Sequence, residues 1–110
     1  MIGIAGTDLL QTHKDLWNEM NIDLSGLQIK DGKTFRWSGK YGSNMDHRET
    51  LSTELNVFEN FKPTMPANYK KADYLFLGNF HPKLQLDVLN LSDNPKFVLI
   101  DTMDLWINTA

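Results

Sequence analysis

The sequence predicts an α/β fold with a parallel-rich sheet and a small antiparallel β segment. Two apolar runs, Tyr74–Leu77 and Lys96–Ile100, have the length and composition of buried strands. The first gives way to Gly78-Asn79 and the second to Asp101-Thr102. Between these runs, Pro82–Leu91 carries apolar residues at helical spacing. Because parallel strands need a long crossover connection, usually a helix, this order of strand, helix and strand predicts a parallel pair.

The N-terminal region predicts another strand and helix. Residues 1–5 form a short apolar run, and from Leu9 to Met20 apolar side chains recur at helical spacing. Thr7 or Asp8 stands where a side chain can accept hydrogen bonds from the first amides of a helix. We therefore expect a strand, an N-cap at one of these two residues, and a helix.

Residues 24–55 predict a small antiparallel sheet. Asp31-Gly32 lies between two alternating runs, and glycine tolerates the positive φ of the tight turns that join hairpin strands. The outer face of this sheet is expected to meet solvent, because it carries basic residues: Lys30, Lys33, Arg36, Lys40 and Arg48.

The predicted domain organisation follows from these elements. Residues 56–66 contain turn residues and two prolines, which interrupt regular structure, and a short helix is expected from Pro66 to Lys71. The chain is thus predicted to be one partial domain over residues 1–110. Its α/β core comprises residues 1–23 and 56–110, and its β segment comprises residues 24–55.

Composition excludes several classes of partner. The 110 residues carry a formal net charge of −3, which gives no excess of cations to neutralise a nucleic-acid backbone. No apolar run approaches the roughly 20 residues that span a bilayer, and no basic, signal-like flank precedes the first strand. The absence of cysteine removes thiolate chemistry and fits a reducing compartment. These features predict a cytoplasmic protein that binds neither nucleic acid nor membrane.

Polar residues follow both strands of the predicted parallel pair. Asn79 and His81 come after the first strand, and Asp101 comes directly after the second. Ligands of open parallel sheets bind beyond the carboxyl ends of the strands, so these three side chains are candidates for holding a ligand. Each has an alternative role, because Asn79 and His81 can cap the following helix and Asp101 can cap a short helix near Asp104.

Arg36 is a fourth candidate, on the predicted β segment. With Trp37, Tyr41 and Arg48 nearby, it offers stacking and charge-assisted hydrogen bonds to a small polar ligand. The alternative is an ordinary solvated sheet face, where alternating charges need no ligand.

The sequence nominates no catalytic residue and no metal site. The three histidines, His13, His47 and His81, are scattered, and no two ligands share a helix face at metal-binding spacing. There is no Gly-x-Ser-x-Gly elbow, no Gly-x-x-x-x-Gly-Lys phosphate loop and no cysteine nucleophile.

Five segments occur in an order and spacing that point to a known family. They are Ile4–Asp8, Asn21–Asp23 with Gly26-Leu27, Gly32–Gly39, Tyr74–Asn79 and Val98–Met103. In these segments the chain resembles the N-terminal half of ribokinase-like, or PfkB, carbohydrate kinases. The resemblance implies a three-layer α/β fold with a parallel-rich central sheet and a projecting antiparallel β lid, the lid corresponding to residues 24–55.

The resemblance also implies an activity. Members of this family transfer the γ-phosphoryl group of ATP to a hydroxyl of a sugar, nucleoside or related alcohol, using Mg²⁺ and a catalytic aspartate in a Gly-Ala-Gly-Asp loop. That loop does not occur in these 110 residues. We therefore expect a kinase fragment that supplies the lid and the substrate-binding residues Arg36, Asn79, His81 and Asp101. Without the loop, the fragment is expected to be inactive and to use neither ATP nor Mg²⁺.

Two alternatives remain open from the sequence. The chain can instead be a small non-catalytic α/β module that binds a ligand or a partner, and within the kinase class the acceptor can be a nucleoside rather than a sugar. Because apolar strand edges of a partial sheet would be unpaired, self-association through the β lid or the exposed sheet edges is also expected.

Overall fold

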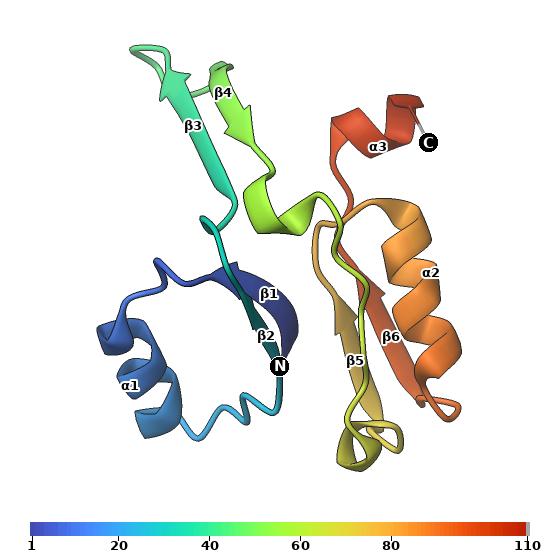
Figure 1. Ribbon diagram of the computed structural model, residues 1–110. Helices are drawn as coiled ribbons and strands as arrows, with labels where there is room; N and C mark the ends of the chain where they lie inside the picture. The colour runs from blue at the N-terminus through green and yellow to red at the C-terminus, as the bar shows by residue number, and fades with distance from the viewer. Residues whose placement is uncertain (110) are drawn as a thin grey trace. The chain divides into compact units, whose positions relative to one another are not determined.

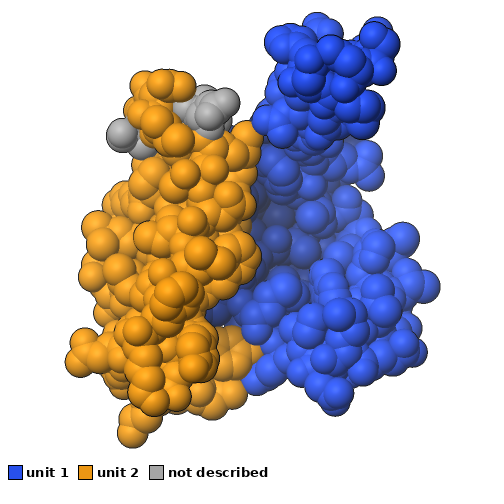
Figure 2. Space-filling model, turned by 180° about the vertical axis from the view of Figure 1, so that it is seen from behind, with its two compact units in different colours: residues 1–61 blue, residues 62–110 orange. Residues whose placement is uncertain are grey.

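The computed structural model describes residues 1–109, except for the side chains of residues 104 and 105, and shows a mixed α/β protein (Figure 1). The predicted α/β class is therefore confirmed at this level, with short sheets of parallel and antiparallel strands. The chain forms two compact units, Met1–Phe61 and Lys62–Ala110, which are coloured separately in Figure 2. No helix among residues 1–109 is long and apolar enough to cross a membrane.

The first unit is built on a parallel strand pair. Strand β1 (Ile2–Gly6) pairs with β2 (Gly26–Lys30) from Ile2 opposite Gly26 to Gly6 opposite Lys30, and helix α1 (Gln11–Glu19) lies between them in the chain. The predicted strand and helix are thus confirmed. The predicted N-cap is wrong: the cap position is Leu10, and the Asp8 carboxylate accepts hydrogen bonds from Thr34 instead.

The antiparallel part of this unit is a single hairpin. Strands β3 (Arg36–Tyr41) and β4 (Arg48–Glu54) pair from Arg36 opposite Glu54 to Tyr41 opposite Arg48, and the turn between them is closed by a bond from Gly42 N to His47 O of 2.9 Å. A short 3₁₀ helix, η1 (Asn56–Phe58), follows the hairpin.

The predicted hairpin turn at Asp31-Gly32 is wrong. The strand before it, β2, pairs in parallel with β1, so the antiparallel strands begin only at Arg36. Gly32 does adopt the positive φ expected of it, at 122°, but in a loop whose Gly32 carbonyl accepts a bond of 3.0 Å from Thr7 N. Glycine adopts a positive φ as readily in a loop as in a hairpin turn, so the Asp31-Gly32 pair does not distinguish the two.

The two faces of the hairpin differ in chemistry. Since side chains alternate along a strand, Arg36, Ser38 and Lys40 share one face, while Trp37 shares the other with Tyr41. The five basic residues predicted to meet solvent are all exposed. They do not share one face, because Arg48 lies over the Trp37 ring, with its guanidinium carbon 5.2 Å from the ring centre.

Gly39 makes room for Trp37 on this second face. A Cβ atom at Gly39 would lie 2.2 Å from Cη2 and 2.4 Å from Cζ2 of the Trp37 ring, which is far inside van der Waals contact. With this space, Trp37 lies along the strand and donates from Nε1 to the Thr50 hydroxyl at 3.3 Å.

The second unit is a strand, helix and strand, as the sequence predicts. Strand β5 (Tyr74–Leu77) pairs in parallel with β6 (Phe97–Ile100), and helix α2 (Pro82–Leu91) connects them. The short 3₁₀ helix η2 (Ala67–Tyr69) precedes β5, and α3 (Asp104–Thr109) follows β6. The predicted bounds of α2 coincide with the observed ones.

The β5–β6 pair is covered on one face only within the described residues. Leu77 and Val88 are buried where the strands meet α2. The opposite face exposes Tyr74 at 76%, Phe76 at 64%, Phe97 at 58% and Leu99 at 53%. The expectation that both runs form buried strands is therefore wrong for this face, because a single crossover helix covers a single side of a sheet.

Replacing Gly39 with alanine tests the packing of Trp37 on the hairpin. Gly39→Ala should push the ring away from Arg48 and Thr50, because its new methyl group would overlap the ring. In a Trp17→Phe, Trp106→Phe background, acrylamide should then quench the fluorescence of Trp37 more strongly than in the parent.

Gly42→Ala is the matched control for this substitution. Its new Cβ would meet only the end of the Asn44 side chain at 3.3 Å and the His47 carbonyl at 3.8 Å, so quenching should stay at the parent value. Equal quenching in Gly39→Ala and the parent would contradict the packing described here.

Candidate functional site

The carboxyl ends of β5 and β6 gather three of the four predicted site residues. The parallel register ends with Leu77 opposite Ile100, and Asp101 N continues the pairing with a bond of 2.9 Å to Leu77 O. The segment with Asn79 and His81 and the start of the segment with Asp101 therefore leave the sheet at the same end. This confirms the predicted geometry of the parallel pair.

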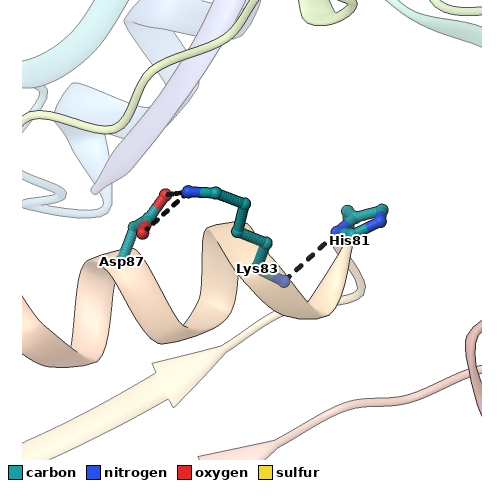
Figure 3. A network of polar contacts seen from close by, with 3 residues as sticks. All are labelled: His81, Lys83 and Asp87. Atoms are coloured by element: carbon teal, nitrogen blue, oxygen red, sulfur yellow. Dashed lines mark hydrogen bonds and ion pairs between the residues drawn. The ribbon is translucent and has the colours of Figure 1, made fainter. Parts of the chain in front are cut away.

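His81 is the N-cap of α2, which confirms the capping alternative for one of its ring nitrogens. Its Nδ1 accepts a hydrogen bond of 3.2 Å from Lys83 N, which Figure 3 shows. Pro82 occupies the first helical position. Farther along the helix, Lys83 forms an ion pair of 2.9 Å with Asp87, four residues later. The capping bond sets the place of the imidazole at the start of α2, and the exposed ion pair adds a small stabilisation to the first turns.

The outer nitrogen of His81 is available to a ligand. A neutral imidazole whose Nδ1 accepts a hydrogen bond carries its proton on Nε2, which is then a donor. No described side chain or backbone group accepts a hydrogen bond from this Nε2. The imidazole and the Trp106 ring form a T-shaped pair, with ring centres 5.1 Å apart and planes at 66°.

Asn79 is held by the segment that follows β6. Its Oδ1 accepts a bond of 2.9 Å from the indole Nε1 of Trp106, and its Nδ2 donates to the sulfur of Met103. The amide is exposed, so a ligand that competes for it must replace these two partners.

The carboxylate of Asp101 is exposed and has no hydrogen-bond partner in the described part of the chain. Within α3, the amides of Trp106 and Ile107 donate to the Met103 carbonyl at 2.9 and 3.1 Å. Of the three strand-end residues, Asp101 is the one that presents an exposed carboxylate.

The Gln85 side chain, on α2, forms hydrogen bonds to the loops that follow both strands. This side chain is only 6% exposed, and its Nε2 donates to the Gly78 carbonyl at 2.8 Å and to the Asp101 carbonyl at 2.9 Å. These bonds tie together the two loops that carry the site. Gln85 is not among the residues predicted from the sequence, although a polar residue among the apolar positions of α2 is a usable signal. No comparable signal in the sequence marks Met103 or Trp106.

Arg36, the fourth predicted residue, lies in the other unit at the start of β3. It is exposed and stands opposite Glu54 in the hairpin register. The pKa of Asp8 is lowered chiefly by the hydrogen bonds from Thr34, and the positive charge of Arg36 adds a smaller lowering.

Within the described residues, no group of three or more histidine and acidic side chains is arranged to hold a metal ion. Comparison of the sequence with protein-family models gives no match, and no curated protein matches it significantly.

Replacing Gln85 tests whether it holds the strand ends. Gln85→Ala leaves two partly buried carbonyls without the donor that joins them, so the free energy of unfolding should fall by about 1–3 kcal/mol. Urea unfolding followed through the amide NMR signals of β5 and β6 measures this change. Asn90→Ala, at an exposed position of the same helix, should change it little; equal effects of the two substitutions would count against the proposed bridge.

Proposed function

We propose that this chain provides the acceptor-substrate side of an ATP-dependent carbohydrate kinase of the ribokinase-like (PfkB) type. In this proposal the β3–β4 hairpin is the lid, and the carboxyl ends of β5 and β6 hold a hydroxyl-rich small molecule. The observation that carries the proposal is the parallel β5–α2–β6 unit, which gathers a free carboxylate, an imidazole donor and an amide at one strand end. The proposal includes a cytoplasmic location, where ATP is available.

The chemistry of these groups suits a polyol. The Asp101 carboxylate accepts hydrogen bonds from hydroxyls, and His81 Nε2 donates one to a hydroxyl oxygen. Asn79 has both a donor and an acceptor, and a ligand that uses them would replace Trp106 and Met103 as partners. A hydroxyl donates and accepts at once, so neighbouring donors and acceptors favour a sugar or nucleoside over a simple anion.

In the proposed kinase, phosphoryl transfer belongs to elements that these 110 residues do not contain. Transfer of a γ-phosphoryl group depends on positioning and on stabilising charge around the reacting phosphate. The family's Gly-Ala-Gly-Asp loop serves this purpose and is absent from the sequence. The residues present here would bind and orient the acceptor only.

A ligand panel tests the proposed site. Pentoses, hexoses, linear polyols and nucleosides are titrated into ¹⁵N-labelled protein, and we expect shifts of the Asn79 and Asp101 amide signals with at least one class. Asp101→Asn should weaken that binding by about tenfold or more, because hydrogen bonds to a charged group contribute about 1.5–3 kcal/mol.

Asp93→Asn is the control, since it removes an exposed carboxylate of the same unit outside the site. It should leave the affinity unchanged. The absence of shifts with every class, or unchanged affinity in Asp101→Asn, would exclude the proposed site.

A second measurement concerns catalysis by these residues alone. With Mg²⁺, ATP and each member of the same panel, the 110-residue protein should consume no ATP in a coupled ADP assay. Sustained turnover that depends on an added acceptor would show that phosphoryl transfer does not need the missing loop. A non-catalytic ligand-binding module would also bind the acceptor without turnover. Kinase activity of a longer reading frame that contains the Gly-Ala-Gly-Asp loop would favour the kinase fragment over such a module.

A further inference from the structure

A polar cluster joins the end of β1 to both legs of the β3–β4 hairpin. We call Asp8, Thr34 and Asn56 the hairpin clasp. Asp8 Oδ1 accepts bonds from the Thr34 amide at 2.8 Å and from the Thr34 hydroxyl at 2.7 Å, and the same hydroxyl accepts from Gly6 N at 2.9 Å. Asn56 Nδ2 donates to the Thr34 carbonyl at 3.0 Å. Thr34 is therefore bonded through its amide, its hydroxyl and its carbonyl.

The clasp lies where the chain enters and leaves the hairpin. Thr34 comes two residues before β3, and Asn56 comes two residues after β4. A backbone bond of 3.1 Å from Val57 N to Lys33 O joins the same two legs. Asn56 has a φ of 52°, a conformation that asparagine tolerates better than most residues, so the exit leg turns back at this point.

Close backbone approach at Gly6 shows that the entry leg is pressed against β1. A Cβ atom at Gly6 would lie 2.2 Å from the Gly32 carbonyl oxygen and 2.6 Å from Thr34 N. No side chain fits there without moving the loop that carries Thr34.

The hairpin beyond the clasp has little burial to fix its direction. Every residue of β4 is exposed, and β3 is exposed apart from Gly39. At the base, Phe35 contacts Phe58 edge to face, with ring centres 6.0 Å apart. The direction of the hairpin therefore depends on contacts at its base, among them the polar bonds of the clasp and this aromatic contact.

We propose that Asp8 is a positioning residue for the β3–β4 hairpin: through Thr34, its carboxylate fixes the direction in which the hairpin leaves the β1–β2 pair. The two bonds from Thr34, the hydroxyl first, lower the pKa of Asp8, so at neutral pH the carboxylate is in the form that accepts both. Arg36 begins β3 two residues after Thr34, so the clasp also sets the position of the Arg36 side chain. The importance of that position for a substrate rests on the proposed function.

Spin labelling tests the direction of the hairpin. The chain has no cysteine, so labels attach only where cysteines are introduced. One label pair is Asn44→Cys, between the hairpin strands, with Glu19→Cys, at the end of α1. Pulsed EPR on this pair measures the distance from the hairpin tip to the rest of its unit. Glu19→Cys with Lys30→Cys, in β2, reports whether that unit stays folded.

Asp8→Ala should broaden and shift the distance distribution from Asn44 to Glu19 and leave that from Glu19 to Lys30 unchanged. Asp8→Asn, which keeps an acceptor oxygen without the charge, should give a smaller change. Asp15→Ala removes an exposed carboxylate of α1 and should change neither distribution.

Two results would overturn the proposal. Unchanged distributions in Asp8→Ala would show that other contacts orient the hairpin. Broadening of both distributions would show that Asp8 stabilises the whole unit rather than the hairpin. Because no ligand is present, a failure here is independent of the sugar-binding test, which concerns Asp101 in the other unit.

Discussion

Parallel pairing is the constraint on which both units depend. Two parallel strands can be joined only by a crossover, and the crossover returns the chain so that both strands end on the same side. The protein uses this arrangement twice, with α1 between β1 and β2 and with α2 between β5 and β6. In each unit, polar residues far apart in the sequence therefore meet beyond a pair of strand ends.

The two strand ends use their carboxylates differently. Asp8 follows β1 and accepts two bonds from Thr34, so its lone pairs hold the chain's own backbone. Asp101 follows β6 and carries an exposed carboxylate without a described partner, while the main chain beneath it is held by Gln85. A carboxylate that accepts hydrogen bonds from its own chain holds that part of the chain in place. A carboxylate without such bonds, on a well-placed backbone, is suited to bind a ligand. This contrast is why the β5–β6 end is the better candidate site.

The sequence predicts what local signals and parallel topology determine. The apolar runs, the helical spacing and Pro82 after His81 define β5, α2 and β6, and the shared exit of Asn79 and Asp101 follows from that topology. The partner of β2 does not follow, because the alternating run and the Asp31-Gly32 signal are equally compatible with pairing to β1 and with a hairpin. Strand pairing is a long-range choice that turn residues do not settle.

Side-chain contacts at the site are predicted less well than its location. Whether His81 caps α2 or faces a ligand depends on its rotamer, and the structure shows its Nδ1 accepting the capping bond from Lys83 N. Gln85 bonds both strand ends only because the face of α2 that carries it lies over the exits of β5 and β6. The contacts of Asn79 with Trp106 and Met103 join residues separated by a strand and a helix, and no periodicity in the sequence encodes them.

Polar bonds have unusual weight in this protein because little apolar surface is buried. Among the described residues, the buried hydrophobic side chains are those of Ala5, Phe61, Leu77 and Val88. Parallel sheets are normally covered on both faces, yet the face of β5–β6 away from α2 is exposed. Such a face favours association, and self-association through the hairpin or the sheets stays a prediction. Since packing alone constrains the strands weakly, the bonds made by Gln85 and Asp8 decide how precisely each strand end is placed, and a ligand site can be only as well ordered as the backbone that presents it.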